Sequence, residues 1–358
     1  MFTDDTDVRN TSIPSLDDCL RPDASSGQSA LQPGDVLEIQ GPPASGKTHV
    51  AYQTIISCIL PHSPRHHGWG KAAMIYDTDG TFQLKRLKAL LYVRLIDSDG
   101  IAEDTGGTTS SFDELVANCL SRVYVFRPTS SIQLAATILN LGHLHATHDR
   151  FVGLEIGLVV VDSLSSFYWQ DRFTVEQFRV GPSGHNTTNP LQHVLSALEN
   201  IRVSHRPIIL LTNWGLNPIG KPGTSTGNAI SPFFKQHLHL LKRPSSPIVH
   251  GLYPIVKTSD DHSASNPPGQ TSSRTRGGSV DPGQGFTHLP LMHHVTLQLS
   301  SASSGDMPTT LSHGEQNDPS QDRDDSHVEG FVRSSGSSQI KTFRFQIRTG
   351  LRRDDLSG

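Results

Sequence analysis

The sequence is poor in cysteine and has no long hydrophobic run. Its three cysteines, Cys19, Cys58 and Cys119, lie far apart and form no Cys-x-x-Cys pair, which excludes a disulfide framework or a cysteine zinc site as an organising principle. A reducing compartment is therefore expected. No run of about 18 apolar residues exists, so no transmembrane helix is predicted. The acidic N-terminus, MFTDDTDVRN, lacks the apolar centre of a signal peptide, and we expect a soluble intracellular protein.

Charge is also scarce and nearly balanced. Only 18% of the 358 residues are charged, and 30 basic against 34 acidic residues give a net charge of −4. A general electrostatic attraction to nucleic acid is therefore not expected, although a local basic patch is compatible with these numbers. The hydrophobic share of 34% is low for a chain that is globular throughout, so we expect a core joined to poorly packed segments.

Apolar patterning is strong from about residue 31 to residue 215 and patchy afterwards. Short aliphatic runs predict strands at 36–39, 72–76, 123–126, 158–161 and 208–211. Helices are predicted at 48–60, 82–96, 112–120, 130–144 and 190–204, with loops at 97–111 and 170–189. Continuous apolar strands that alternate with helices are typical of an α/β fold with a mainly parallel, twisted sheet and helices on both faces. Functional residues are expected where those strands end.

The remaining divisions follow from composition. We expect a short N-terminal segment over 1–30 and a core over 31–256. Downstream, a disordered insertion is expected over 257–287, and edge strands over 288–350 are expected to be split by a low-complexity insertion over 300–339, before a tail over 351–358. The C-terminal third is thus predicted to be partly disordered.

A glycine-rich stretch between the first predicted strand and helix carries the clearest chemical signal. It fits G-x-x-x-x-G-K-[ST] in full, with the residues Gly41, Pro42, Pro43, Ala44, Ser45, Gly46, Lys47 and Thr48. Successive main-chain N–H groups and the start of a helix can together bind phosphates. Lys47 would reach the β and γ phosphates of ATP, and Thr48 would offer its hydroxyl to Mg²⁺.

A second candidate for the metal is Asp162. It ends the aliphatic run LVVVD, and a carboxylate delivered by a neighbouring strand can hold the coordination shell of Mg²⁺ in P-loop NTPases. By itself an apolar run that ends in Asp is weak support. In combination with the glycine loop it predicts that Thr48 and Asp162 share one metal site.

The run Asp77-Thr78-Asp79-Gly80-Thr81 allows another reading. After a strand, D-x-D-G-T resembles the first motif of haloacid-dehalogenase-type phosphatases, in which the first Asp would be the nucleophile, here Asp77, and the second, Asp79, an acid/base. Such phosphatases have no phosphate loop upstream, which argues against this reading. It remains an alternative from a different class.

Three stretches together resemble the core of eukaryotic RecA-type recombinases, and more narrowly the recombinase paralogues. They are GDVLEIQGPPASGKT (34–48), AMIYDTDGTFQLKRL (73–87) and LVVVDSLSSFYWQDR (158–172). The last is the most specific, since the phosphate loop alone is shared by very many NTPases. The resemblance covers about residues 12–215, with order and spacing intact.

This resemblance implies a RecA-like core that binds ATP and Mg²⁺. It also implies a nuclear role in the repair of DNA double-strand breaks by homologous recombination, assisting assembly of the recombinase filament. The paralogues work in a hetero-oligomer, and for this member the D-type paralogue is the implied contact. DNA would be contacted through the complex, because the DNA-facing loops, at about 170–189 and after Trp214, are not strongly basic here.

Two positions depart from the active recombinases. The Glu that orients the attacking water corresponds to Asp79 here, which is one methylene shorter, and a misplacement of about 1 Å can cost on the order of 10²-fold in rate. The Gln that senses the γ-phosphate corresponds to Trp214, whose indole can donate one hydrogen bond and accept none. We therefore expect ATP binding with slow or negligible turnover. The alternative within this fold is a DNA-dependent, ATP-hydrolysing motor with Asp79 as its catalytic residue.

Overall fold

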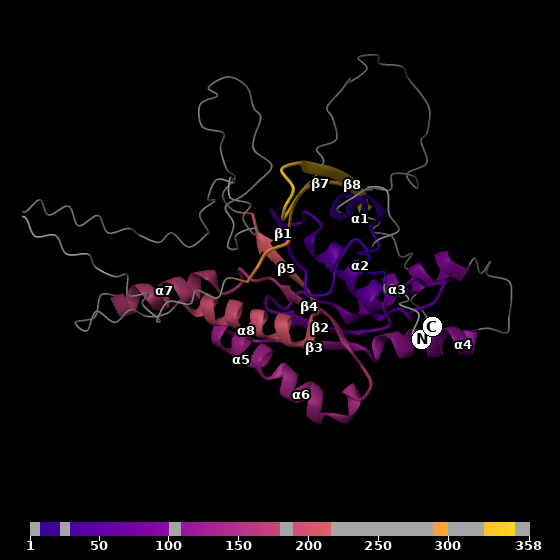
Figure 1. The fold of residues 1–358 in the computed structure, drawn as a ribbon, viewed down its shortest axis with the longest axis horizontal. Coiled ribbons are helices and arrows are strands. Elements are labelled where there is room, and N and C mark those ends of the chain that lie inside the picture. The colour runs from indigo at the N-terminus through magenta and orange to yellow at the C-terminus, as the bar shows by residue number, and fades with distance from the viewer. Residues whose placement is uncertain are drawn as a thin grey trace, which may run out of the picture.

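The described residues form one mixed sheet with helices on both faces (Figure 1). The computed structural model describes residues 8–21, 29–99, 109–179, 189–215, 289–299 and 326–347. Within these ranges the eight strands lie in the order β3-β2-β4-β5-β1-β6-β7-β8. The strands are β1 (Val36–Gly41), β2 (Ala72–Asp77), β3 (Val123–Phe126), β4 (Ile156–Asp162), β5 (Ile208–Trp214), β6 (His293–Leu299), β7 (Ser326–Ser334) and β8 (Ile340–Ile347).

Strands β1 to β6 all run parallel, and β7 and β8 extend the sheet as an antiparallel pair. This confirms the predicted α/β fold with a mainly parallel sheet. The register sets Gly41 of β1 beside Trp214 of β5, and Asp77 of β2 beside Asp162 of β4. Because parallel strands end on the same side, the phosphate loop and both aspartates meet at one edge of the sheet.

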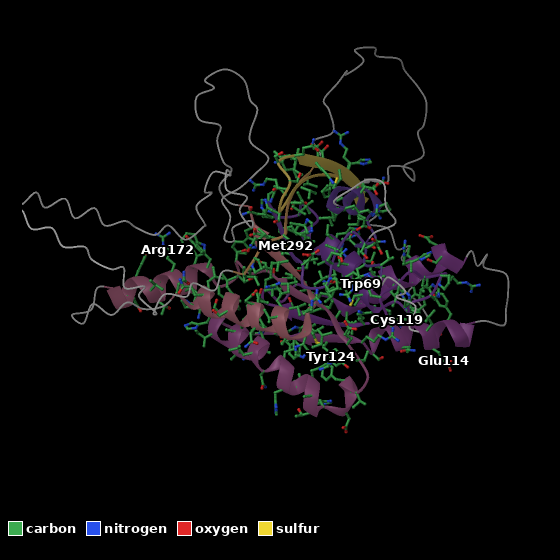
Figure 2. All side chains as sticks on the ribbon, in the orientation of Figure 1. Trp69, Glu114, Cys119, Tyr124, Arg172 and Met292 are labelled. Atoms are coloured by element: carbon green, nitrogen blue, oxygen red, sulfur yellow. The ribbon has the colours of Figure 1, made fainter. Side chains whose placement is uncertain are left out.

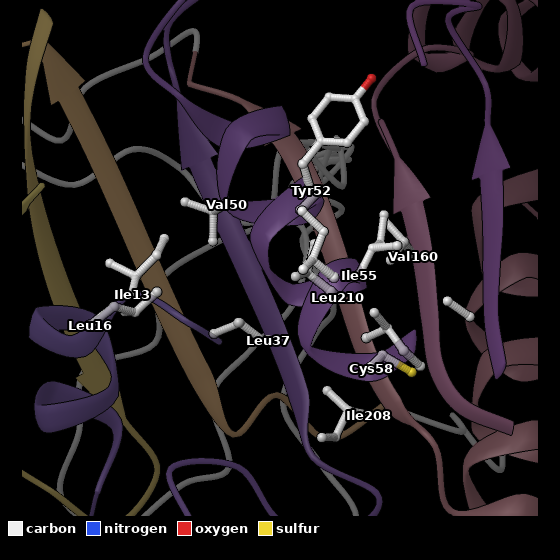
Figure 3. Close-up of a cluster of buried hydrophobic side chains, with 14 of the residues drawn as sticks. Ile13, Leu16, Leu37, Val50, Tyr52, Ile55, Cys58, Val160, Ile208 and Leu210 are labelled. Atoms are coloured by element: carbon white, nitrogen blue, oxygen red, sulfur yellow. The ribbon is translucent and has the colours of Figure 1, made fainter. Parts of the chain in front are cut away.

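Helices cover the sheet in two layers. They are α1 (Pro14–Leu20), α2 (Lys47–Ile59), α3 (Leu84–Asp99), α4 (Thr109–Leu120), α5 (Ser131–Leu139), α6 (Leu141–Thr147), α7 (Tyr168–Arg179) and α8 (Pro190–His205). One hydrophobic cluster joins α1 to α4 to the sheet, as Figure 3 shows for Leu16, Leu37, Val50 and Leu210. A second cluster on the opposite face contains side chains of α5, α6 and α8. Among the described helices, none combines the length and the apolar character needed to cross a membrane.

The helix predicted over 130–144 is present as two helices. Ser130 is the N-cap of α5, where its Oγ accepts a hydrogen bond from the N–H of Gln133 at 3.1 Å, as expected. Asn140 then separates α5 from α6. Asn140 and Gly142 are both weak helix formers, and the periodicity of their apolar neighbours concealed the break.

Helix α7 occupies much of the segment 170–189, which was expected to be a loop, and that expectation was wrong for residues up to Arg179. Its exposed face carries Trp169 and Phe173, each 62% exposed, while the buried Asp171 accepts a hydrogen bond from Ser131 at 2.6 Å. Arg172 lies over the Trp169 ring, and Figure 2 shows it on α7 away from the centre of the sheet. Aromatic side chains outside and a carboxylate inside invert the usual pattern, so periodicity gave no helical signal.

Strand β7 lies inside 300–339, where a low-complexity insertion was expected, so that boundary was wrong for residues 326–334. The strand places Gly330 against Phe343 of β8, whose ring atoms come within 2.2 Å of the position a Cβ would take. Because a glycine lies at the centre of the strand, β7 has few apolar residues from which a strand could be predicted. The segments 257–287, 300–325 and 351–358 lie outside the described residues.

The part of the expected N-terminal segment over 8–21 belongs to the core. Ile13 and Leu16 are buried in the same cluster as α2 (Figure 3). Asp17 of α1 is buried and accepts two hydrogen bonds from Thr11, from its N–H at 2.7 Å and from its hydroxyl at 2.8 Å. Burial nevertheless raises the pKa of Asp17 to about 6, because desolvation outweighs these hydrogen bonds.

This raised pKa gives the protein a defined pH dependence. The ionised Asp17 opposes folding, so its contribution is most favourable below its unfolded pKa near 4 and is lost as the pH rises through about 6. Asp17→Asn, which keeps an oxygen acceptor for Thr11, should stabilise the protein at pH 7.5 by up to about 3 kcal/mol and have little effect at pH 4. Denaturant unfolding across this range measures the difference. Asp18→Asn on the exposed side of α1 is the control, and an equal pH profile for both variants would contradict the assignment.

Candidate functional site

The phosphate loop connects two fully formed elements. All six residues of β1 are buried, and α2 begins at Lys47 with Gly46 as its N-cap at φ +90°. A Cβ at Gly41 would lie 2.5 Å from Ser45 Oγ and 2.6 Å from the carbonyl oxygen of Leu297. Such distances leave no space for a side chain, so the close approach of the main chain requires glycine at Gly41. The left-handed conformation at Gly46 requires glycine for a different reason, since a Cβ would strain it.

Lys47 is folded back over its own loop. Its Nζ donates to the carbonyl oxygens of Gly41 at 2.9 Å and Pro42 at 2.7 Å. Burial lowers the pKa of Lys47, while the nearby charges of Asp162 and Asp79 oppose that shift. The ammonium group is therefore close to both carboxylates that the sequence singled out.

Asp162 ends β4 as a buried carboxylate. Its Oδ1 accepts a hydrogen bond from the hydroxyl of Thr212 on β5, and its Oδ2 has no partner among the residues that the structure describes. Burial raises the pKa of Asp162, an effect that the hydroxyls of Thr212 and Thr48 and the charge of Lys47 partly offset. The structure thus brings Thr48 and Asp162, the two expected metal ligands, together.

Asp77 does not have the surroundings of a nucleophile. Its Oδ1 accepts from the N–H of Phe82 and its Oδ2 from Nε of Arg127, both at 3.2 Å, and the carboxylate is buried. Both oxygens are thus engaged in holding the turn after β2. The geometry gives no support to the phosphatase alternative.

Asp79 projects from this turn as an exposed side chain. Its Oδ1 accepts hydrogen bonds from the N–H of Thr81 at 3.2 Å and from the Thr81 hydroxyl at 2.7 Å. Its charge acts on both Lys47 and Asp162, so it faces the phosphate loop. The Thr81 contacts hold the carboxylate close to its own backbone.

A group of hydroxyls near Asp162 was missed by the sequence reasoning. The Thr78 hydroxyl donates to the carbonyl oxygen of Ser163 at 2.6 Å and lies 2.9 Å from Ser166 Oγ. Ser165 Oγ accepts from the N–H of Trp214 at 3.0 Å. These contacts join the ends of β2, β4 and β5. The serine-rich run after Asp162 is the sequence feature from which these contacts could have been predicted. The family resemblance alone did not indicate them.

The strand that ends in Trp214 also contributes a buried polar pair. Asn213 Nδ2 donates to Glu38 Oε1 at 2.6 Å, and both side chains are fully buried. The two residues lie on neighbouring strands, two residues apart in register, since Asn213 pairs with Gln40 and Glu38 pairs with Leu211. The end of β5 is thus fixed to β1 just before the phosphate loop begins.

The residues present fit a phosphate group with a divalent cation. Ser45 Oγ and Asp162 Oδ2 are both buried, and neither has a hydrogen-bond partner in the described ranges. Oxygen ligands of this type are those that Mg²⁺ prefers, and orphaned buried oxygens are costly unless a ligand occupies them. A cationic side chain, two orphaned oxygens and a loop that excludes side chains therefore meet at one place.

The buried charge of Asp162 should make the site costly to fold. Asp162→Asn should stabilise the ligand-free protein at pH 7.5, on the order of 1 kcal/mol, because it removes a poorly solvated charge while an oxygen remains for Thr212. The gain should disappear as the pH falls through the pKa of the folded carboxyl, where the wild-type side chain becomes neutral. Thermal unfolding at several pH values measures this. A destabilised variant at neutral pH would contradict it.

Sequence comparisons agree with this geometry. No protein-family model matches the chain. The chain is 26% identical over 228 residues to a DNA repair protein XRCC2 homolog of Arabidopsis thaliana, covering 56% of this chain and 60% of the plant protein. It is 30% identical over 197 residues to DNA repair protein XRCC2 of Mus musculus, covering 55% of this chain and 62% of the mouse protein.

A third similar protein comes from an archaeon. The chain is 26% identical over 167 residues to DNA repair and recombination protein RadA of Haloquadratum walsbyi, covering 44% of each chain. The chain spans about six tenths of the length of the two XRCC2 relatives. The parallel sheet and the complete phosphate loop agree with a RecA-like fold, and the chain is similar to DNA repair proteins named XRCC2 and RadA.

Proposed function

We propose that this protein is an ATP-binding subunit of a recombination-repair complex, in which the nucleotide serves assembly more than it serves as fuel. The observation that carries the proposal is the phosphate loop, where Gly41 and Gly46 shape the main chain and Lys47 lies over it. The similarity to XRCC2 proteins supports the role in repair of DNA double-strand breaks by homologous recombination.

The residues of the loop would divide the work of binding. The main-chain N–H groups of residues 44–48 would hold the phosphates, assisted by the partial positive charge at the start of α2. Lys47 would exchange its two carbonyl contacts for phosphate oxygens. Thr48 and Asp162 would hold Mg²⁺, which supplies charge neutralisation for the phosphates when bound. Ionised Asp162 suits a cation that compensates for its burial.

The residues at the two positions that serve hydrolysis in active recombinases, Asp79 and Trp214, are compatible with ATP binding but do not favour ATP hydrolysis. Asp79 is held by Thr81 and is one methylene shorter than the Glu that orients water in active recombinases. Trp214 stands where those enzymes carry a γ-phosphate-sensing Gln, and an indole offers no acceptor. We therefore infer slow or negligible hydrolysis of bound ATP.

The partners of the protein follow from the resemblance. We infer that it works in the nucleus in a hetero-oligomer of recombinase paralogues, with the D-type paralogue as its direct contact, and that it assists recombinase filament assembly. DNA would be contacted through the complex. The exposed face of α7 supports this division, since its Arg172 is already paired with Glu176 at 2.8 Å and adds little free positive charge.

Nucleotide binding is the first test. The full chain, alone or with its partner, should bind a fluorescent ATP analogue in the presence of Mg²⁺, and Lys47→Ala should weaken binding by at least about tenfold, the scale of one lost charged hydrogen bond of about 1.5–3 kcal/mol. Lys71→Ala, which removes an ion pair with Glu155 away from the loop, is the matched control. Equilibrium dialysis that detects no uptake of labelled ATP by folded protein would refute the proposal.

Turnover is the second test, measured as phosphate release with and without single-stranded DNA. We expect a low rate that Asp79→Asn leaves unchanged, because the shorter carboxylate is not placed to orient water. A substantial DNA-stimulated rate that Asp79→Asn abolishes would instead establish the motor alternative. Asp113→Asn, which changes a carboxylate that contacts Tyr92 rather than the phosphate loop, controls for loss of charge.

A further inference from the structure

The C-terminal hairpin β7–β8 packs against the phosphate loop at Gly46. A Cβ at Gly46 would lie 3.0 Å from Ile347 Cδ1, 3.3 Å from Phe345 Cζ and 3.4 Å from Val328 Cγ2. These three side chains come from two strands that are almost 300 residues downstream in the sequence, and Ile347 and Val328 are buried. The glycine at the start of α2 is thus in contact with the hairpin on the side where a side chain would point.

The same hairpin contacts the first turn of α2 through a pair of rings. The Phe345 ring is stacked on the His49 ring, with centroids 6.0 Å apart and planes 7° from parallel. Phe343 stacks in turn on Phe345, at 6.0 Å and 10°. His49 directly follows Thr48, the residue expected to bind the metal.

The hairpin is itself held on two sides. Arg333 of β7 donates to His294 Nδ1 at 2.8 Å. Since arginine can only donate, His294 carries its proton on Nε2 and donates to Gln40 Oε1 at 3.1 Å, one residue before the phosphate loop. The hairpin is therefore tied by hydrogen bonds to the strand that leads into the loop.

On its outer side, β8 is held by the N-terminal helix. Ser15 of α1 donates to the carbonyl oxygen of Arg344 at 2.8 Å, and Cys19 donates to that of Thr342 at 3.5 Å. These two carbonyls belong to alternate residues, so they face the same edge of the strand. Lys341 also donates to the carbonyl oxygen of Arg21 at 2.8 Å. A free edge of the sheet is thus partly covered, and β8 is fixed against the core.

We propose that Phe345 and Ile347 are positioning residues for the nucleotide site. The C-terminal hairpin that carries them packs against Gly46 and the first turn of α2 and holds their conformation. This inference rests on the proposed function. The main-chain N–H groups of residues 44–48 would bind phosphate only if Gly46 and the first turn of α2 keep their conformation. Without the ring of Phe345, that turn loses one of its three hairpin contacts at Gly46 and the stack on His49. Part of the binding free energy must then be spent on ordering the loop.

The experiment compares Phe345→Ala and Ile340→Ala in the full chain. Phe345→Ala should weaken binding of the ATP analogue by about tenfold, within the range of coupling between sites. Ile340 lies on the same strand and is 52% exposed, so Ile340→Ala should bind like the wild type. All measurements are made well below the unfolding temperature of each variant.

Hydrogen exchange separates positioning from general loss of stability. In nucleotide-free protein, Phe345→Ala should speed exchange of the amides in 44–48 while leaving those of β4 and β5 unchanged. Should Phe345→Ala fail to fold, Phe345→Leu keeps most of the volume without the stack and should give the same selective change. Equal affinity and equal exchange for wild type and variant would overturn the inference. Absence of nucleotide binding by the wild type would instead reject the proposed function, and exchange would still test the hairpin.

Discussion

The structure depends on one close contact between main-chain segments, where β1 passes into α2 against the end of β6. Gly41 has no room for a Cβ because Ser45 and the carbonyl of Leu297 occupy that space. The N–H of Gly215 donates to the Gly41 carbonyl at 2.9 Å, so β5 is fixed at the same point. A loop held this closely on both sides can present its amides to one ligand in one geometry, which is the pre-organisation that phosphate binding requires.

Around this loop, the buried charges of Asp162 and Lys47 oppose folding of the ligand-free protein, and a charged ligand would compensate for them. Asp162 and Lys47 are both buried enough that their charged forms are disfavoured, and each partly compensates the other. A triphosphate with a divalent cation would bring both signs of charge to this place at once. Under the proposed function, stability would be given up for binding at this site, as is common where buried charged groups meet.

Local pattern was enough to predict the central part of the fold. The aliphatic runs before Gly41 and Asp162 are fully buried strands, and a strand–loop–helix with the full phosphate-loop spacing has few other structures open to it. Two elements could not be predicted, because their stabilisation is tertiary. Helix α7 turns its aromatic residues outward and is held by the buried Asp171, while β7 needs the ring of Phe343 to fill the space at Gly330. The engaged carboxylate of Asp77 likewise depends on Arg127, which follows the end of β3.

The two departures from the active recombinases differ in kind from these packing effects. Asp79 and Trp214 alter side chains that would act on the reacting phosphate, yet the elements that carry them are intact: the turn is held by Asp77, and β5 is fixed by Asn213 and Ser165. If the fold itself had been altered, these supporting hydrogen bonds would be lost together with the reacting groups. Because the supports are complete and only the reacting groups differ, the geometry agrees with the proposal that the protein holds nucleotide, and bound ATP would then stabilise the loop, α2 and the hairpin that contacts them as one unit.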